Sequence, residues 1–526
     1  MNPSAPAPHF NISDEFVSRP AREHPERIAI LGVDREVTYG VLESEVNRVA
    51  QALRNSHCRP GDRVLLLLPD SLEFVSSFFG VAKMGAIAVP VNSMARAADY
   101  RHFLSDSGAA IAIVHWSVLA DVLTAAANLP LARLVVAGGT RRAVEYMSRS
   151  VTHWLDWLPS DTRGVLSHQT SKTDPAFFLY TSGSGGTPKA AVHRHQDMLA
   201  CSEGFAKGVL GLRADDRTYS VSKLFFAYGL GNGMYFPFSS GAATVLDPER
   251  PRADRAMEIV KRYKPTIFFS VPTFYAAILR EAERGNVGDF SSVRFAVSAG
   301  ESLPAEIFQR FRERFGIEIL DGIGSTEMLH MFLSARPGEA KPGSCGREVP
   351  GYEARILDDR GRPAGNGDIG NLWVKGGSAF SEYWNLPELT QRAREGDWIL
   401  TGDKFTRDAD GFYHYCGRGD DMMKVSGMWV SPNEVENALL SHSAVAEAAV
   451  VARTDPVGLT RTLAFVVLRP GITQPAGGLD SEIHAWVHTR LVGYKCPHEI
   501  RVVSELPKTA TGKIQRFVLR QPGKLG

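Results

Sequence analysis

Short apolar runs alternate with segments of helical periodicity through the first four-fifths of this 526-residue chain. The apolar runs predict strands at 29–31, 64–68, 86–91, 111–114, 134–136, 177–180, 243–246, 266–271, 295–297 and 318–320. Segments with a helical pattern lie between some of them, at 41–54 and 72–84. Alternation of this kind is typical of α/β layers with largely parallel sheets, so we predict an α/β fold.

The pattern changes near residue 354, where short strands and turns take over. Strands are expected at 354–357, 371–374 and 411–415, which predicts a small β-subdomain at about 343–417. A helix at 432–441, strands at 446–451 and 463–468, and a helix at 481–491 then predict a compact α+β domain. We therefore expect a flexible leader at 1–15, a large N-terminal domain of layered α/β sheets at 16–419, and a small mobile C-terminal lid domain at 420–526.

Composition excludes some partners without identifying a function. The 59 basic and 58 acidic residues nearly cancel, so no nucleic-acid partner is expected. Five scattered cysteines without a Cys-x-x-Cys pair fit a reducing cytosol. The longest apolar stretch, 74–91, is interrupted by Lys83, and the N-terminus has no signal pattern. We expect a cytoplasmic protein that does not interact with membranes.

The run from Tyr180 to Ala191 carries the clearest chemical signal. A buried strand leads into a loop rich in glycine and hydroxyl groups, whose backbone N–H groups can form a concave site for a polyphosphate. The P-loop spacing Gly-x-x-x-x-Gly-Lys-[Ser/Thr] is absent, and a flexible surface loop would look similar. The candidate phosphate ligands are Thr181, Ser182, Gly183, Ser184, Gly186, Thr187 and Lys189.

Four further motifs follow this loop in order along the chain. They are Asp321 to Glu327, Trp398 to Asp403, Gly417 to Gly427 and Pro507 to Ile514. Together the five segments resemble the adenylate-forming superfamily of acyl-CoA synthetases, luciferases and peptide-synthetase adenylation domains. The resemblance extends from about Phe16 to Leu519.

Within that superfamily the chain looks most like the benzoate-CoA ligases. The segments that carry this likeness are Lys223 to Asn232, Gly324 to Phe332, Val425 to Gly427, Val430 to Pro432 and Leu506 to Phe517. The resemblance implies an ATP- and Mg²⁺-dependent ligase that joins an aromatic carboxylate to coenzyme A through an acyl-adenylate. An acyl-AMP ligase that loads a carrier protein, and a CoA ligase for an alicyclic acid such as cyclohexanecarboxylate, remain alternatives. A catalytically silent nucleotide-binding regulator is disfavoured by the complete motif set. A monomer or homodimer is expected.

The resemblance also implies roles for individual residues. Glu327 would bind magnesium, Thr326 would donate to the α-phosphate, and Lys513 would bond the carboxylate and bridging phosphate oxygens. Asp403 would accept from the ribose hydroxyls, with Arg418 beside it. Without the motifs, Glu327 would be interpreted as an acid at a helix N-terminus, Asp403 as a turn aspartate and Lys513 as a solvated surface lysine. Adenine would lie between two loops that contain Gly300, Glu301, Asp321, Gly322 and Ile323.

The resemblance further implies residues that bind coenzyme A and the acid, and a hinge for the lid. Lys424, Ser426 and Gly427 would line the coenzyme A channel, and Asp420 would be the hinge of the lid. Lys508 is kept as a solvated lysine. The acyl pocket would be lined by Phe226, Ala227, Tyr228, Ala299, Gly324, His330 and Met331.

The chain departs from the family pattern at four positions. Gly185 stands where threonine is usual, Ala190 replaces a glycine, Ile323 replaces an aromatic residue, and Trp429 replaces an arginine found in some members. Relatives specific for benzoate often have isoleucine at the Met331 position, and methionine is longer and more adaptable. Ser184 and Thr187 can compensate for the hydroxyl group missing at Gly185.

Overall fold

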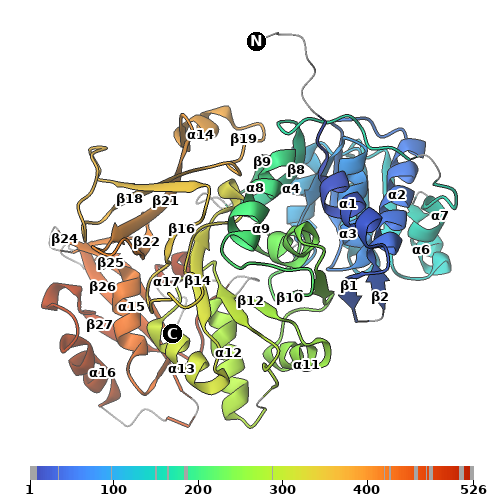
Figure 1. Cartoon of the computed structure of the whole chain (residues 1–526). Coiled ribbons are helices and arrows are strands. Elements are labelled where there is room, and N and C mark those ends of the chain that lie inside the picture. The colour runs from blue at the N-terminus through green and yellow to red at the C-terminus, as the bar shows by residue number, and fades with distance from the viewer. Residues whose placement is uncertain are drawn as a thin grey trace.

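A computed structural model of the chain describes residues 9–33, 35–95, 97–148, 151–162, 165–182, 187–286, 288–419, 421–425, 428–454, 460–469, 471–472, 478–508 and 514–521. Two α/β halves lie side by side in the larger part of the molecule, and the C-terminal elements, orange to red, pack beside α12 and α13 (Figure 1). The predicted α/β class with a smaller α+β part at the C-terminal end is confirmed.

The first half is built on an eight-stranded sheet in the order β19-β9-β8-β4-β3-β5-β6-β7. The strands from β8 to β7 run parallel, and β9 and β19 are antiparallel to their neighbours. Their bounds are β3 (Arg63–Leu67), β4 (Ile87–Pro90), β5 (Ile111–His115), β6 (Arg133–Ala137), β7 (Val151–His153), β8 (Pro175–Ser182), β9 (Pro188–Arg194) and β19 (Glu382–Tyr383).

The second half is a nine-stranded sheet in the order β16-β15-β14-β13-β12-β10-β11-β1-β2. Its inner strands are parallel, so β13 and β14 end at the same edge of the sheet. The bounds are β1 (Ile28–Gly32), β2 (Glu36–Thr38), β10 (Arg217–Ser220), β11 (Ala243–Leu246), β12 (Ile267–Ser270), β13 (Phe295–Ser298), β14 (Ile319–Gly324), β15 (Met331–Ser334) and β16 (Arg347–Glu348).

Smaller sheets complete the described part of the chain. An antiparallel sheet contains β17 (Tyr352–Leu357), β18 (Gly370–Gly376), β20 (Arg394–Glu395), β21 (Trp398–Arg407) and β22 (Tyr413–Arg418). A two-stranded ribbon pairs β23 (Met423–Val425) with β24 (Met428–Val430). The C-terminal sheet consists of β25 (Val445–Thr454), β26 (Thr460–Leu468) and β27 (Glu499–Val502).

The helices follow from apolar spacing and polar caps. In α2, Leu42, Val46, Val49 and Leu53 share one buried face, and Thr38 caps the helix by accepting from the Val41 amide. The α-helices are α1 (Arg19–Glu23), α2 (Tyr39–Asn55), α3 (Leu72–Lys83), α4 (Ala97–Ser107), α5 (Leu119–Ala125), α6 (Arg141–Met147), α7 (Trp154–Trp157), α8 (His195–Cys201), α9 (Ala227–Leu230), α10 (Phe236–Ser239), α11 (Ala253–Tyr263), α12 (Pro272–Glu283), α13 (Ala305–Phe315), α14 (Pro387–Arg392), α15 (Pro432–Leu440), α16 (Leu479–His488) and α17 (Arg516–Leu519). Short π- or 3₁₀-turns are η1 (Asp14–Ser18), η2 (Trp116–Val118), η3 (Ser202–Lys207), η4 (Gly231–Tyr235), η5 (Thr326–Met328) and η6 (Gly493–Lys495).

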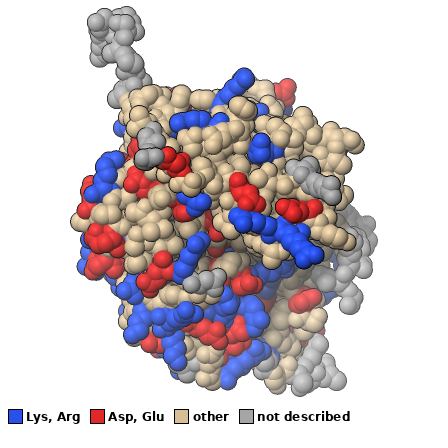
Figure 2. Space-filling view, turned by 90° about the vertical axis from the view of Figure 1, so that its right-hand side faces the viewer, with Lys and Arg blue, Asp and Glu red and all other residues tan. Residues whose placement is uncertain are grey.

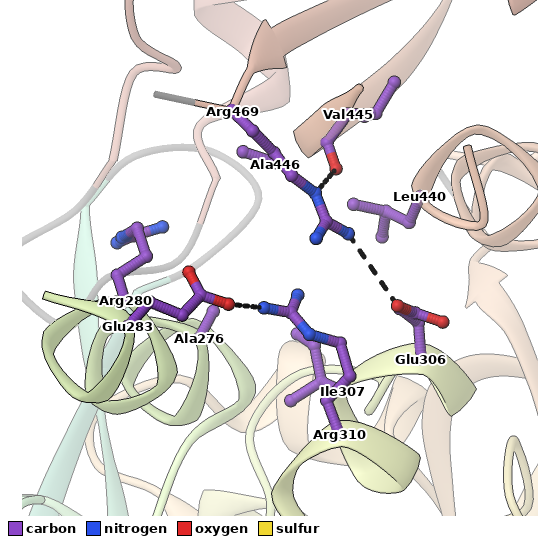
Figure 3. A pocket seen from close by; sticks show the side chains of 10 residues that line it. All are labelled: Ala276, Arg280, Glu283, Glu306, Ile307, Arg310, Leu440, Val445, Ala446 and Arg469. Carbon is purple, nitrogen blue, oxygen red and sulfur yellow. Dashed lines mark hydrogen bonds and ion pairs between the residues drawn. The ribbon is translucent and has the colours of Figure 1, made fainter. Parts of the chain in front are cut away.

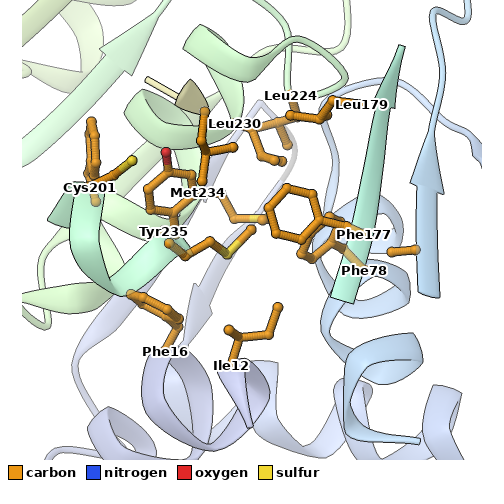
Figure 4. Close-up of a cluster of buried hydrophobic side chains, with 14 of the residues drawn as sticks. Ile12, Phe16, Phe78, Phe177, Leu179, Cys201, Leu224, Leu230, Met234 and Tyr235 are labelled. Atoms are coloured by element: carbon orange, nitrogen blue, oxygen red, sulfur yellow. The ribbon is translucent and has the colours of Figure 1, made fainter. Parts of the chain in front are cut away.

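The N-terminal segment corrects one expectation. Residues 11–15 were predicted to belong to a flexible leader, but Asn11, Ile12 and Ser13 are buried. Asn11 Nδ2 donates to the Ala82 carbonyl at 2.8 Å, and Ile12 lies in the same apolar cluster as Phe16 and Phe177 (Figure 4). Polar residues lie on both sides of Ile12, so the sequence has no apolar pattern here that would predict burial.

The surface and the cysteines agree with the composition. On the face in Figure 2, acidic and basic side chains are intermixed. All five cysteines are free and buried. No helix among the described residues is long and apolar enough to cross a membrane.

Ion pairs join the C-terminal elements to α12 and α13. Arg469 Nη2 lies 3.7 Å from Glu306 Oε1, and Arg280 Nη1 lies 3.5 Å from Glu447 Oε1. Figure 3 shows the Arg469 side chain pointing across the boundary toward Glu306. These two pairs, which we call the domain clasp, are partly solvent-exposed.

Candidate active site

Two strand ends from different sheets meet at one point. β8 and β9 flank the glycine-rich loop, and β14 leads into η5, which carries Thr326 and Glu327. Lys189 at the start of β9 brings its Nζ within 3.8 Å of Glu327 Oε1. A glycine-rich loop and a carboxylate at the ends of strands fit the usual position of nucleotide sites in α/β proteins.

Most of the predicted phosphate loop, including Gly183, Ser184, Gly185 and Gly186, lies outside the described residues, as does the side chain of Ser182. Thr181 is half-buried and Thr187 is exposed. Ala190 is buried in β9. Burial lowers the pKa of Lys189, whereas Glu327 opposes this shift.

Buried groups hold the Thr326–Glu327 turn in place. His193 Nε2 donates to the Thr326 carbonyl at 2.8 Å, and His193 Nδ1 lies 3.0 Å from Asp197 Oδ2. The Phe380 amide donates to the Glu327 carbonyl at 2.7 Å. Since His193 and Asp197 are fully buried, their hydrogen bonds anchor this backbone turn to the core.

The Glu327 carboxylate has a hydrogen-bond partner that was not predicted from the sequence. Tyr383 Oη donates to Glu327 Oε1 at 2.5 Å, and Lys189 Nζ lies 3.8 Å from the centre of the Tyr383 ring. Tyr383, His193 and Asp197 lie outside the motifs, and no local pattern distinguishes these residues from ordinary core residues.

The predicted ribose ligand lies on a hairpin. Asp403 and Arg418 face each other across β21 and β22, and Arg418 Nη1 donates to Asp403 Oδ1 at 3.2 Å. Burial raises the pKa of Asp403 and Arg418 opposes this shift. The pair thus leaves one carboxylate oxygen, Oδ2, clear of the Arg418 contact.

The predicted adenine loops follow β13 and lie in β14. Asp321 is 6% exposed, and burial raises its pKa well above the usual range. Ile323 is half-buried and Gly300 is exposed. Gly322 lies against β15, because a Cβ at this position would lie 2.5 Å from the Leu333 carbonyl oxygen. Glu301, beside Gly300, is partly buried.

The structure brings several residues of the predicted acyl pocket together. The Tyr228 and His330 rings lie 5.4 Å apart, and a Cβ on Gly324 would lie 2.4 Å from the His330 carbonyl oxygen. His330 Nε2 lies 3.1 Å from Asn232 Oδ1, and burial lowers the pKa of His330 to about 3, so the ring is neutral. Met331 is buried. Asn232 was not among the predicted residues of the acyl pocket.

The other residues of this set differ in burial. Ala299 is buried, and Phe226 and Ala227 are half-buried, with the Phe226 ring packed edge to face against Phe225. The half-buried positions leave part of this wall open to a ligand.

Most of the predicted lid residues lie outside the described part of the chain. Lys513, Asp420, Ser426 and Gly427 lie outside the described residues, and of Lys424 and Trp429 only the backbone is described. Lys508 was expected to be solvated. Lys508 is indeed exposed, and its Nζ also lies 2.6 Å from Glu447 Oε2.

Comparisons with known proteins agree with this geometry. The family model for AMP-binding enzymes matches residues 17–384. The chain belongs to the AMP-binding enzyme family. A model of the C-terminal domain of AMP-binding enzymes matches residues 434–513. The superfamily resemblance inferred from the motifs is therefore confirmed.

Individual members of the AMP-binding enzyme family resemble the chain over nearly its whole length. The benzoate–CoA ligase of Thauera aromatica is 43% identical, with 92% of this chain and 90% of the relative covered. The 4-hydroxybenzoate–CoA/benzoate–CoA ligase of Rhodopseudomonas palustris is 38% identical, with 98% and 95% covered. The crystal structure of the anthranilate CoA ligase AuaEII with anthranoyl-AMP has a TM-score of 0.92 and 40% identity, with 99% and 98% covered. The likeness to benzoate-CoA ligases is confirmed.

Proposed function

We propose that the protein is an AMP-forming aryl-CoA ligase, which converts an aromatic carboxylate, ATP and coenzyme A to an aroyl-CoA, AMP and diphosphate. The observation that carries the proposal is the meeting of Lys189 and Glu327 beside the Thr326 turn. It brings a cation, a carboxylate and a hydroxyl to one point between the two sheets. The relatives at 37–43% identity act on benzoate and its hydroxylated forms.

Adenylation requires two anions to be held together while charge shifts at the α-phosphate. A carboxylate oxygen of the acid attacks the α-phosphorus, and the bond to the bridging oxygen breaks to release diphosphate. Lys189 and the loop residues Thr181 and Thr187 offset the phosphate charge, and Thr326 donates to the α-phosphate. Catalysis of this kind depends mainly on positioning and electrostatics.

Glu327 is the residue that would hold Mg²⁺. Among the described residues no group of three or more His, Cys, Asp or Glu side chains gathers to hold a metal ion. Mg²⁺ prefers one or two carboxylates together with phosphate oxygens, so a single glutamate beside a phosphate loop fits it. When bound, the ion would neutralise charge on the phosphates. The contacts of Tyr383 and Lys189 both involve Oε1, which leaves Oε2 for a metal.

The nucleoside has its own set of ligands in this proposal. Asp403 accepts from the ribose hydroxyls, with Arg418 fixing its carboxylate. The base packs between Gly300 and Ile323 and donates its amino group toward Asp321. An aliphatic Ile323 supplies packing instead of ring stacking.

Thioester formation completes the reaction. The thiolate of coenzyme A attacks the acyl carbon, and the bond to the AMP oxygen breaks. Lys513 serves adenylation, while Lys424, Ser426 and Gly427 serve the coenzyme A channel. One small domain is unsuited to presenting both surfaces at once, so it rotates between the half-reactions about Asp420.

The acid lies against Phe226, Tyr228, His330 and Met331. Small residues at Ala227, Ala299 and Gly324 leave a flat slot for a planar ring. Because the buried His330 ring is neutral, it offers a hydrogen-bonding edge without a charge. This environment suits benzoate and benzoates with small polar substituents.

A substrate panel tests the function. AMP and acyl-CoA release should be followed with benzoate, hydroxy-, amino- and chlorobenzoates and cyclohexanecarboxylate, with and without coenzyme A. We expect acyl-CoA with at least one benzoate, and AMP release that depends on coenzyme A. Equal AMP release with and without coenzyme A would instead favour transfer to a carrier protein. Turnover of only the alicyclic acid would overturn the aromatic assignment.

A further inference from the structure

Tyr383 reaches the candidate active site from a part of the sequence far from Lys189 and Glu327. It ends the two-residue strand β19, which pairs with β9 through Tyr383 and Ala191. That pairing brings it next to the strand that begins just before Lys189. Tyr383 is only 3% exposed.

The tyrosine uses both parts of its side chain. The hydroxyl donates to Glu327 Oε1 at 2.5 Å, and the face of the ring lies 3.8 Å from Lys189 Nζ. A cation over an aromatic ring is held by the ring quadrupole. One residue therefore orients both the carboxylate and the ammonium group.

We propose that Tyr383 is a positioning residue for the metal–nucleotide complex: its hydroxyl holds Glu327 so that Oε2 faces the metal, and its ring holds Lys189 beside the phosphate loop. The inference rests on the proposed role of Glu327. A glutamate side chain has several rotatable bonds, and Mg²⁺ demands near-octahedral geometry, so fixing one carboxylate oxygen removes rotamers that cannot bind.

A purely structural role is the competing explanation. The Tyr383 ring also packs on Phe380, with centroids 4.6 Å apart, and that contact does not need the hydroxyl. Tyr383→Phe therefore removes the bond to Glu327 and keeps the ring contacts. Tyr413→Phe is a matched control, because Tyr413 is 1% exposed and donates to Glu348 Oε1 at 2.6 Å, away from Lys189 and Glu327.

The test is metal affinity measured without turnover. Mn²⁺ binding in the presence of α,β-methylene-ATP is followed by electron paramagnetic resonance, together with the KM for Mg²⁺ and for benzoate. We expect Tyr383→Phe to weaken Mn²⁺ binding about 10-fold, the scale of losing a partner of a metal ligand, and to raise the KM for Mg²⁺ but not for benzoate. Tyr413→Phe should bind Mn²⁺ as the wild type does.

The outcomes separate this inference from the function it rests on. Wild-type Mn²⁺ affinity in Tyr383→Phe, alongside weakened affinity in Glu327→Gln, would overturn the role of Tyr383 alone. Wild-type affinity in Glu327→Gln would instead remove the metal assignment itself. An equal loss in Tyr383→Phe and Tyr413→Phe would mean that the effect is general loosening of the fold.

The ring has a separate test. Tyr383→Leu removes both the hydroxyl and the ring, so metal-free ATP should bind several-fold more weakly than to Tyr383→Phe. Equal metal-free affinity of the two variants would show that the ring does not hold Lys189.

Discussion

At the scale of single residues, the site consists of a few polar groups held by buried neighbours. Glu327, Asp403 and His330 are candidates from the sequence because each lies in a motif. Tyr383 and His193 could not, because their roles arise from contacts between distant strands. Asn11 and Ile12 were misjudged for a similar reason, since their partners lie far along the chain.

Met331 tests the ring selectivity of the pocket. The methionine methyl group lies against the backbone of Gly322, where it can shift to admit a substituent. Isoleucine is branched at Cβ and stiffer, so Met331→Ile should lower kcat/KM for substituted benzoates relative to benzoate by about 1 kcal/mol, the scale of one methylene. Rates over the substrate panel measure the ratio, and an unchanged ratio would mean that Met331 does not line the pocket.

His195 gives the fold a defined pH dependence. It is buried, and desolvation lowers its pKa to about 4, against the opposing charges of Asp174, Asp197 and Asp14 and with a smaller lowering effect of His9. As pH falls below about 6.5, His195 binds a proton in the unfolded chain but stays neutral in the folded protein. The contribution of neutral His195 to the free energy of unfolding is therefore complete above about pH 6.5 and is lost progressively toward pH 4.

The consequence is measurable by urea unfolding at pH 7.5 and pH 5.5. The wild type should lose about 1 kcal/mol more of its free energy of unfolding over this range than His195→Gln, which has no imidazole to protonate. A variant that loses as much as the wild type would exclude His195 as a source of the acid sensitivity.

At the scale of elements, long strands and helices were predictable, whereas short connections were not. The recurrence of apolar residues every three to four positions in α2 and α3 is visible in the sequence. The strand β19 has two residues, too few for any periodicity, and its place beside β9 depends on tertiary pairing. The turn after β14 was recognised through its motif rather than through its hydrophobic pattern.

That turn is tightly packed. A Cβ on Gly324 would lie 2.4 Å from the His330 carbonyl oxygen and 2.8 Å from the Met331 amide, and neither backbone atom can move without opening the β14–β15 pair. Gly324→Ala should displace Thr326 and Glu327 and lower kcat/KM by about 100-fold, the cost of a small misplacement at a reacting centre. Gly493→Ala, where a Cβ meets nothing within 4 Å, is the control in the same steady-state assay. Near-wild-type activity of Gly324→Ala would show that the turn tolerates displacement.

At the scale of the whole molecule, the boundary between the large and small parts was predicted from a change in pattern, but its contacts were not. The domain clasp consists of long charged side chains, which sequence periodicity cannot pair. Its two ion pairs are partly exposed, so each should contribute less than about 1 kcal/mol and should weaken with salt. Ion pairs this weak can favour one orientation of the C-terminal domain without preventing its rotation.

The clasp can be tested by proteolysis at the domain boundary. Glu306→Gln combined with Glu447→Gln should increase the rate of tryptic cleavage between the two parts several-fold at low salt, and the difference should shrink at high salt. Glu203→Gln breaks the surface pair with Lys207 within the large part and should leave the rate unchanged. An unchanged rate in the double variant would mean that these pairs do not hold the two parts together.

Lys513 tests whether the small part supplies a catalytic group. We expect Lys513→Ala to lower adenylate formation by about 100- to 1,000-fold, the scale of removing one preorganised donor. Thioester formation from supplied acyl-adenylate should be less affected, since that step uses the other surface of the domain. Single-turnover rates of both half-reactions distinguish this from equal losses, which would exclude the adenylation role.

The burial of all five cysteines has a chemical consequence for an enzyme of this kind. An acyl-adenylate is a mixed anhydride, and it acylates any thiolate that it meets. Every cysteine is at most 8% exposed, and burial raises each thiol pKa, to about 12 for Cys58 and to about 11 for Cys201 and Cys416. Since the thiolate is the reactive form, none of these side chains can intercept the activated acid. We therefore expect coenzyme A to attack the activated acid without competition from a cysteine thiolate of the enzyme.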